Sequence, residues 1–75
     1  MKELVESMAL ALVDHPDEVT VTEKTDGQSV TVYLTVHPDD MGKVIGKQGR
    51  IAKAMRSVVN AAAVNQDKRV QLEIG

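Results

Sequence analysis

The sequence contains no cysteine, tryptophan or phenylalanine, and Tyr33 is its only aromatic residue apart from the two histidines. Without cysteine the chain forms neither a disulfide nor a thiolate metal site, which fits a reducing compartment. No apolar run approaches the about 20 residues that a membrane helix needs, and no signal-peptide cleavage region is present. We therefore expect a cytoplasmic protein that has no membrane partner.

Acidic residues are absent from the stretch 41–66, although the chain has eleven of them. The net charge of −2 by itself argues weakly against a nucleic-acid partner. A phosphate backbone meets the local field, however, and here that field is positive. The other interpretation is that the cations of this stretch form the solvated face of one helix. They are Lys43, Lys47, Arg50, Lys53 and Arg56.

The length of 75 residues is enough for one small domain, which we place over residues 1–75. A domain of this size buries only roughly 60% of the surface that its unfolded chain exposes. Its stability is therefore expected to be modest.

The first half of the chain predicts a helix followed by a β-hairpin. Apolar residues recur at helical spacing from about Lys2 to Val13. Glu18–Lys24 and Ser29–Val36 are predicted strands, and the second alternates apolar with polar residues. Asp26-Gly27 predicts a two-residue type I′ turn between them.

The register of this hairpin follows from the predicted turn. Pairing Thr25 with Gln28 puts apolar residues opposite one another. Val21 then faces Val32, and both point toward the helices. Tyr33 lies on the opposite face, where we expect it to pack against a neighbouring strand and not to stack on a base.

The second half of the chain predicts two helices and a third strand. A short helix from about Pro38 or Asp39 to Ile45 ends at Gly46, a residue type common just past a helix. A longer helix begins near Arg50 and ends between Val64 and Gln66, and Arg69–Ile74 alternates as a strand. The apolar face of the longer helix is predicted to consist of Ile51, Met55, Val58, Val59 and Ala62.

The element order α-β-β-α-α-β predicts an α+β fold. It places three helices on one face of a three-stranded sheet. The sheet is mixed if the last strand lies parallel to the second.

The turn Gly46-Lys47-Gln48-Gly49 connects the two predicted helices. Glycine permits a sharp turn and the close approach of another molecule. The first N–H groups of the second helix are unpaired and lie at its positive dipole end, which favours an anion. The spacing excludes a P-loop and a dinucleotide-binding fingerprint. The alternative is a helix–turn–helix corner without a ligand, and Gly42 is interpreted as a close-packing position.

Residues 40–54, and Val44–Ile51 above all, resemble the core motif of KH domains, in which a G-x-x-G loop joins two helices. The order α-β-β-α-α-β is similar to the type II arrangement of bacterial KH domains. The resemblance covers the chain from Met1 to Gly75, and we expect no further domain. In this the sequence most resembles the small stand-alone KH proteins of the KhpA (YlqC) family.

The resemblance implies that the protein binds single-stranded RNA and is not an enzyme. Phosphates would approach Gly46 and Gly49, and bases would lie in an apolar groove lined by Ile45, Ile51 and part of the central strand. The scarcity of aromatic residues argues against modules that stack bases on aromatic platforms. The RNA-binding residues implied in this way are Lys43, Ile45, Gly46, Lys47, Gln48, Gly49, Arg50, Ile51 and Lys53.

The resemblance also implies a biological setting. Proteins of this family resemble RNA chaperones and post-transcriptional regulators that act with a larger KH partner of the KhpB (Jag) type and affect cell shape and wall synthesis. It implies a homodimer, a heterodimer with that partner, or both, and no cofactor. The rival hypothesis is a KH-fold dimerisation module that has little RNA affinity of its own.

The remaining candidate residues give little support for other chemistry. His15 and His37 each precede a proline beside acidic residues, but they come from separate segment boundaries, so no metal site is predicted. The serines lie on helix or strand patterns, and no catalytic residue is predicted. Residues 61–63 are all alanine, which indicates either a close helix–helix contact in a dimer or simply high helix propensity.

Overall fold

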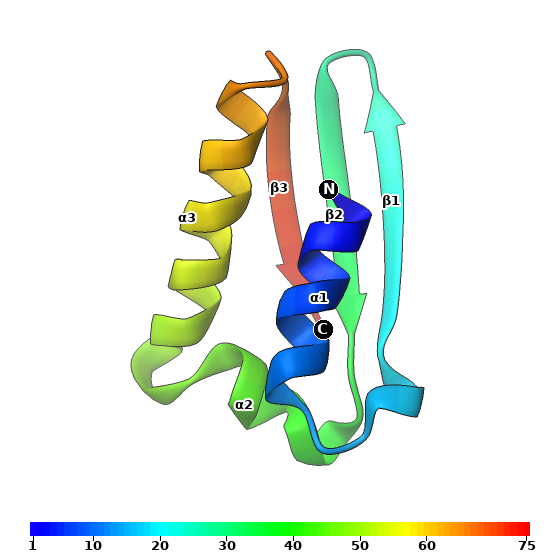
Figure 1. Ribbon diagram of the computed structural model, residues 1–75, viewed down its shortest axis with the longest axis vertical. Helices are drawn as coiled ribbons and strands as arrows, with labels where there is room; N and C mark the ends of the chain where they lie inside the picture. Colours follow the sequence, from blue (N-terminus) through cyan, green and yellow to red (C-terminus); the bar gives the residue numbers. More distant parts are fainter.

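Three strands form one mixed sheet in the computed structural model, which describes residues 1–75. β1 (Thr20–Asp26) pairs antiparallel with β2 (Ser29–Thr35), and β2 pairs parallel with β3 (Arg69–Ile74). The strand order β1-β2-β3 places β2 in the centre and leaves one edge of β3 unpaired (Figure 1). The predicted mixed sheet is confirmed.

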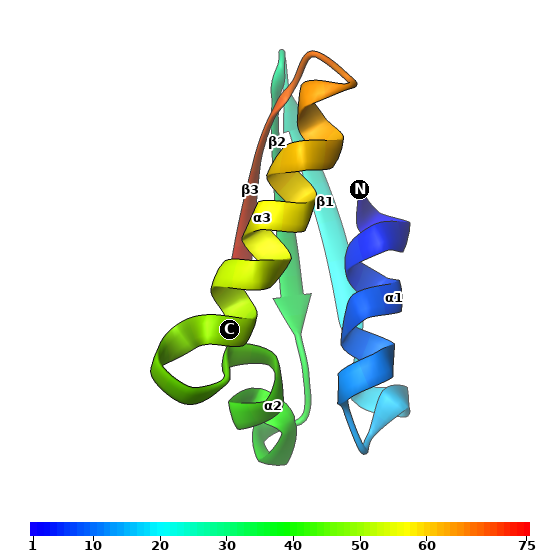
Figure 2. The same ribbon diagram turned by 60° about the vertical axis from the view of Figure 1, so that its left-hand side comes forward.

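Two helices cover one face of this sheet, as Figures 1 and 2 show from two directions. They are α1 (Lys2–Leu12) and α3 (Arg50–Val64). A short helix, α2 (Met41–Ile45), lies beyond the end of β2 and leads into the glycine turn. The order α-β-β-α-α-β is confirmed. None of these helices combines the length and the apolar character that crossing a bilayer requires.

The hydrophobic core lies between the sheet and the two long helices. Alternate residues of β2 and of the segment that follows it point into the core, as their period of two predicts. Each fully buried aliphatic side chain contributes roughly 1.5–3 kcal/mol of transfer free energy. The core residues from the strands and helices include Val5, Ala9, Val30, Val32, Leu34, Val36, Met55, Val59 and Leu72.

The predicted hairpin register is wrong by two residues. Asp26 pairs with Ser29, so the loop consists of Gly27 and Gln28, and Val21 lies opposite Leu34. Two local features explain the shift: a 3₁₀ turn over Pro16–Glu18 delays the first strand, and only Gly27 of the loop has a positive φ, +63°. That is the requirement of a type II′ turn and not of type I′. Because the shift is even, every side chain keeps its predicted face.

The apolar face of α3 is also rotated relative to the prediction. The buried residues of the helix are Ala52, Met55, Val59 and Ala63. Val58, predicted to be in the core, is 46% exposed and lies on the side of the helix that faces α1. The buried face therefore includes two alanines, Ala52 and Ala63, beside the larger Met55 and Val59.

Candidate nucleic-acid interface

The turn between α2 and α3 has an unusual backbone. Gly46 has φ 77° and ψ 172°, Gln48 has φ 58°, and Gly49 has φ 74°. Three of its four residues therefore occupy the positive-φ region that disfavours most side chains. The turn connects α2 to α3 within four residues, and Gln48 is exposed.

The two glycines of the turn, Gly46 and Gly49, have different roles. A Cβ on Gly46 would lie 2.6 Å from the Cγ1 atom of Ile51 and 2.9 Å from the Ile51 nitrogen. Gly46 is therefore needed for packing as well as for its backbone conformation. A Cβ on Gly49 would meet nothing within 4 Å, so this position is open to an approaching molecule.

Gly42 differs from the prediction. A Cβ at this position in α2 would also meet nothing within 4 Å, so the interpretation of Gly42 as a close-packing position is wrong. Gly42 lies on the exposed side of α2, and the buried residue of this helix is Val44.

Both flanks of the turn are anchored in the core. Val44 is fully buried, and Ile51 is partly buried against the core cluster. Ile45 is 36% exposed between them. The turn thus projects from two fixed points, which limits the conformations available to its exposed residues.

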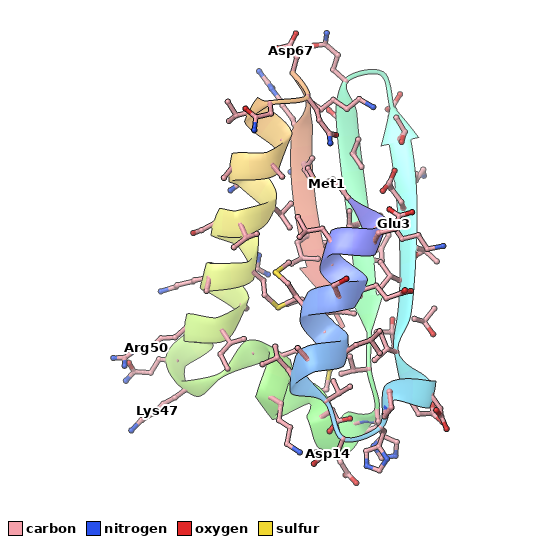
Figure 3. All side chains as sticks on the ribbon, in the orientation of Figure 1. Met1, Glu3, Asp14, Lys47, Arg50 and Asp67 are labelled. Atoms are coloured by element: carbon pink, nitrogen blue, oxygen red, sulfur yellow. The ribbon has the colours of Figure 1, made fainter.

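One cation in the turn and one directly after it have no acidic partner. The side chains of Lys47 and Arg50 project together from the domain, as Figure 3 shows. Arg50 Nη2 lies 3.5 Å from Gln48 Oε1, at the limit of a hydrogen bond. Lys53 is exposed one turn further along α3. The structure therefore brings Lys47, Gln48, Arg50 and Lys53 together.

Lys43 is held elsewhere. Its ammonium group donates a hydrogen bond to the carboxylate of Asp14 and lies 3.6 Å from Asp40 Oδ1. The hydrogen bond to Asp14 raises the pKa of Lys43 above its ordinary 10.5. The stretch 41–66 contains no acid in the sequence, but acids from outside it lie close to it in the structure. Asp14 and Asp40 neutralise the charge of Lys43.

Asp40 is a buried carboxylate that fixes the start of α2. Its two oxygens accept the N–H groups of Asp14 at 3.2 Å and His15 at 3.0 Å. Burial alone raises the pKa of Asp40, but these two hydrogen bonds and the charges of His15 and Lys43 lower it, so that the pKa lies below 3.8. The connection after α1 is thereby tied to the segment that leads to the turn.

A groove that sequence analysis missed lies between α3 and the unpaired edge of β3. It has a volume of about 320 Å³ and is lined by Arg56, Val59, Asn60 and residues 70–73. Arg56 Nε donates to the carbonyl oxygen of Leu72 at 3.3 Å. Arg50, Lys53, Arg56 and Asn60 follow one another at steps of three or four residues, so they form a polar stripe from the turn to this groove. The helical spacing was visible in the sequence, but the strand edge beside it was not.

The groove expected from Ile45, Ile51 and the central strand is different in the structure. Ile51 lines an apolar groove of about 380 Å³ between α1 and α3, and no residue of β2 takes part in it. The groove is open to solvent on the helical side of the domain. Its lining residues are Met8, Ala11, Leu12, Arg50, Ile51, Ala54, Met55 and Val58.

Comparison with known proteins assigns the chain to a family. The family model described as "KhpA/KhpB, KH domain" matches residues 2–74. The chain is 68% identical over 74 residues to "RNA-binding protein KhpA" of Halalkalibacterium halodurans, covering 99% of this chain and 97% of that protein. It is 62% identical over 74 residues to the protein of the same name from Clostridium acetobutylicum, with 99% of both chains covered. The chain belongs to the KhpA/KhpB family of KH domains.

Proposed function

We propose that this protein binds single-stranded RNA through the turn Gly46–Gly49 and does so without catalysis. The observation that carries the proposal is the combination of an open, left-handed turn with the unpaired cations Lys47 and Arg50. Relatives of the chain bear the name RNA-binding protein, which supports the same substrate class.

The sugar–phosphate backbone is the part of the RNA that fits the turn. Gly49 leaves room for close approach, and Lys47 and Gln48 supply a charge and an amide at the exposed tip. The start of α3 adds the positive end of its helix dipole. We assign Lys53 to a neighbouring phosphate, and Lys43 to a positioning role, because its charge is already paired.

The bases are then directed along α3 to the groove beside β3. Asn60 and Gln71 offer amide donors and acceptors there, and Arg56 offers a guanidinium plane. These groups suit the edges and faces of unstacked bases, which is how single-stranded RNA is recognised. Ile45 and Ile51 act mainly by holding the turn in position.

A second function is favoured by the apolar groove between α1 and α3. We propose that a second copy of the chain docks there, or a KhpB (Jag)-type KH protein whose domain belongs to the same family. All but one of the eight lining residues are apolar, and Val58 is 46% exposed within it. Covering such an apolar groove removes apolar surface from water, which is favourable. If RNA affinity were absent, this contact would support the alternative of a dimerisation module.

The wider role remains a proposal that rests on family membership. We propose a cytoplasmic RNA chaperone or post-transcriptional regulator that acts with a larger KH partner and affects cell shape and wall synthesis. Crosslinking to cellular RNA, in cells with and without the partner, tests this role. Loss of crosslinks only when the partner is absent would assign RNA binding to the complex.

The direct test of RNA binding is ultraviolet crosslinking followed by sequencing, with wild type compared to a Gly49→Asp variant. Gly49→Asp places a carboxylate where a phosphate is proposed to lie, while the Cβ itself meets no neighbour. We expect the variant to lose crosslinks. Equal crosslinking of folded wild type and folded variant would contradict the proposal.

A further inference from the structure

Two histidines stack at the corner of the domain where the chain leaves α1 and where it leaves β2. The ring centroids of His15 and His37 are 4.2 Å apart, and the rings are inclined by 24°. Asp39 adds a carboxylate whose Oδ2 lies 3.7 Å from His37 Nδ1. One ligand atom from each of the three residues lies within 4.8 Å of the other two. Figure 3 marks this corner by Asp14, next to His15 in the chain.

The fold holds the two histidine segments together independently of the rings. Each histidine precedes a proline that begins a 3₁₀ turn, at Pro16–Glu18 and at Pro38–Asp40. The buried carboxylate of Asp40, in the second turn, accepts the backbone N–H of His15 in the first, at 3.0 Å. The two segments are therefore preorganised, and the side chains of His15 and His37 meet without a ligand between them.

We propose that His15, His37 and Asp39 bind a Zn²⁺ ion, with water at the fourth position. Imidazole nitrogen and carboxylate oxygen are ordinary zinc ligands, and three protein ligands leave one position open. Two ligands of a tetrahedral zinc ion, at bonds of about 2.0–2.2 Å, lie about 3.4 Å apart. The separation of 3.7 Å between His37 Nδ1 and Asp39 Oδ2 is close to that value.

The hydrogen bonding of His37 indicates that its Nδ1 atom has the lone pair that a zinc ion needs. His37 Nδ1 accepts the backbone N–H of Asp39 at 3.0 Å, so in the neutral ring this nitrogen carries no proton. The ion takes the place of that hydrogen bond and no proton has to leave His37. The ring of His15 has to turn out of the stack to direct its own nitrogen at the ion, which is a local movement of one side chain.

Zinc binding would strengthen the link between the segment after α1 and the segment before α2, which leads to the turn Gly46–Gly49. The ion would link the segment after α1 to the segment before α2, where Asp40 already makes a link. A ligand that prefers the folded state raises the unfolding temperature, and the rise grows with its concentration. The proposal concerns this corner alone and does not depend on whether the chain binds RNA.

The test uses the full chain without a polyhistidine tag, titrated with zinc chloride and, in parallel, with magnesium chloride. We expect zinc to shift the imidazole NMR signals of both histidines and to raise the unfolding temperature. Magnesium should do neither, because it prefers oxygen ligands. Signals of both histidines that stay unchanged, or a shift confined to one of them, would overturn the proposal.

Substitutions distinguish a specific zinc site from adventitious binding of zinc to surface carboxylates. His15→Ala and His37→Ala should each weaken zinc binding by at least about tenfold. Asp39→Asn should weaken it, whereas Asp26→Asn, the same change of charge in the distant hairpin, should not. Asp39 is 77% exposed, so its variant is expected to fold normally. Equal zinc affinity in wild type and in Asp39→Asn, or in a folded double-histidine variant, would show that the ion binds adventitiously and would overturn the assignment.

Discussion

Ile51 packs against Gly46 so closely that a Cβ on the glycine would lie 2.6 Å from its Cγ1 atom. Gly49, three residues later, has open space at the same place. The two glycines of the turn are therefore not equivalent. Gly46 is required by the packing of the protein itself, whereas Gly49 leaves open space, which we propose an incoming ligand occupies.

Gly46→Ala should destabilise the domain more than Gly49→Ala. The first substitution combines a strained backbone, about 1–3 kcal/mol, with a steric overlap of similar cost. The second costs only the penalty of a left-handed residue, about 1–2 kcal/mol. Urea unfolding followed by circular dichroism measures both. Equal losses of unfolding free energy would show that the close contact with Ile51 does not constrain the fold.

RNA binding should depend on salt with a shallow slope. If three or four phosphates are neutralised, the slope of log K against log salt is roughly −2 to −3, at about 0.7 for each phosphate of a single strand. Fluorescence anisotropy with a labelled pool of single-stranded RNA, at several salt concentrations, gives this slope. Binding that does not vary with salt would rule out the phosphate contacts.

Lys47→Ala and Lys43→Ala form a matched pair for the same assay. Lys47 is unpaired, so its removal should make the salt slope shallower by about 0.7. Lys43 is already paired with Asp14 and Asp40, so Lys43→Ala should leave the slope unchanged and lower stability. A larger loss of salt dependence at Lys43 than at Lys47 would reverse the assignment of the two lysines.

Stability should decline at acidic pH in part through Asp40. Its folded-state pKa is lowered below 3.8, so the unfolded chain takes up the proton first as the pH falls. The stabilisation by this carboxylate is complete above about pH 3.8 and is lost as the pH drops through the folded pKa. Carbon-13 NMR of the carboxyl groups should show that Asp40 titrates below the exposed aspartates. An Asp40 that titrates above them would contradict the hydrogen-bond pattern.

Self-association through the apolar groove should be sensitive to Val58 and not to Val64. Both residues are exposed valines of α3, but only Val58 lines the groove. Val58→Glu should therefore shift a dimer to monomer in sedimentation velocity, while Val64→Glu should behave as wild type. If both variants remain dimeric, the second copy binds elsewhere, for instance along residues 61–63.

Sequence periodicity predicts which face of a strand each side chain occupies, but it does not predict which residues pair across strands. The faces of the strands were predicted because a period of two fixes them, and an even register shift leaves them unchanged. The partners of Val21 were missed because the 3₁₀ turn before β1 and the type II′ geometry at Gly27 are set by local backbone energetics.

The candidate site was predicted where its residues are neighbours in the sequence. Gly46, Lys47, Gln48 and Gly49 form one turn, so a motif could identify them. The neutralisation of Lys43 depends on Asp14, which is 29 residues away, and the groove at Arg56 depends on the edge of β3. Such contacts follow from tertiary packing, which a single sequence does not display.

The most direct test of the central claim compares the RNA affinities of Gly49→Asp and Gly49→Asn. Aspartate and asparagine have nearly the same shape and both tolerate the left-handed conformation of this position. They differ in that aspartate carries a negative charge, whereas asparagine is neutral and its amide can donate a hydrogen bond. If a phosphate lies at Gly49, the aspartate variant should bind a labelled pool of single-stranded RNA at least about tenfold more weakly than the asparagine variant, or about 1.4 kcal/mol. Equal affinity of the two folded variants would contradict the assignment of the turn as the site that holds the RNA backbone.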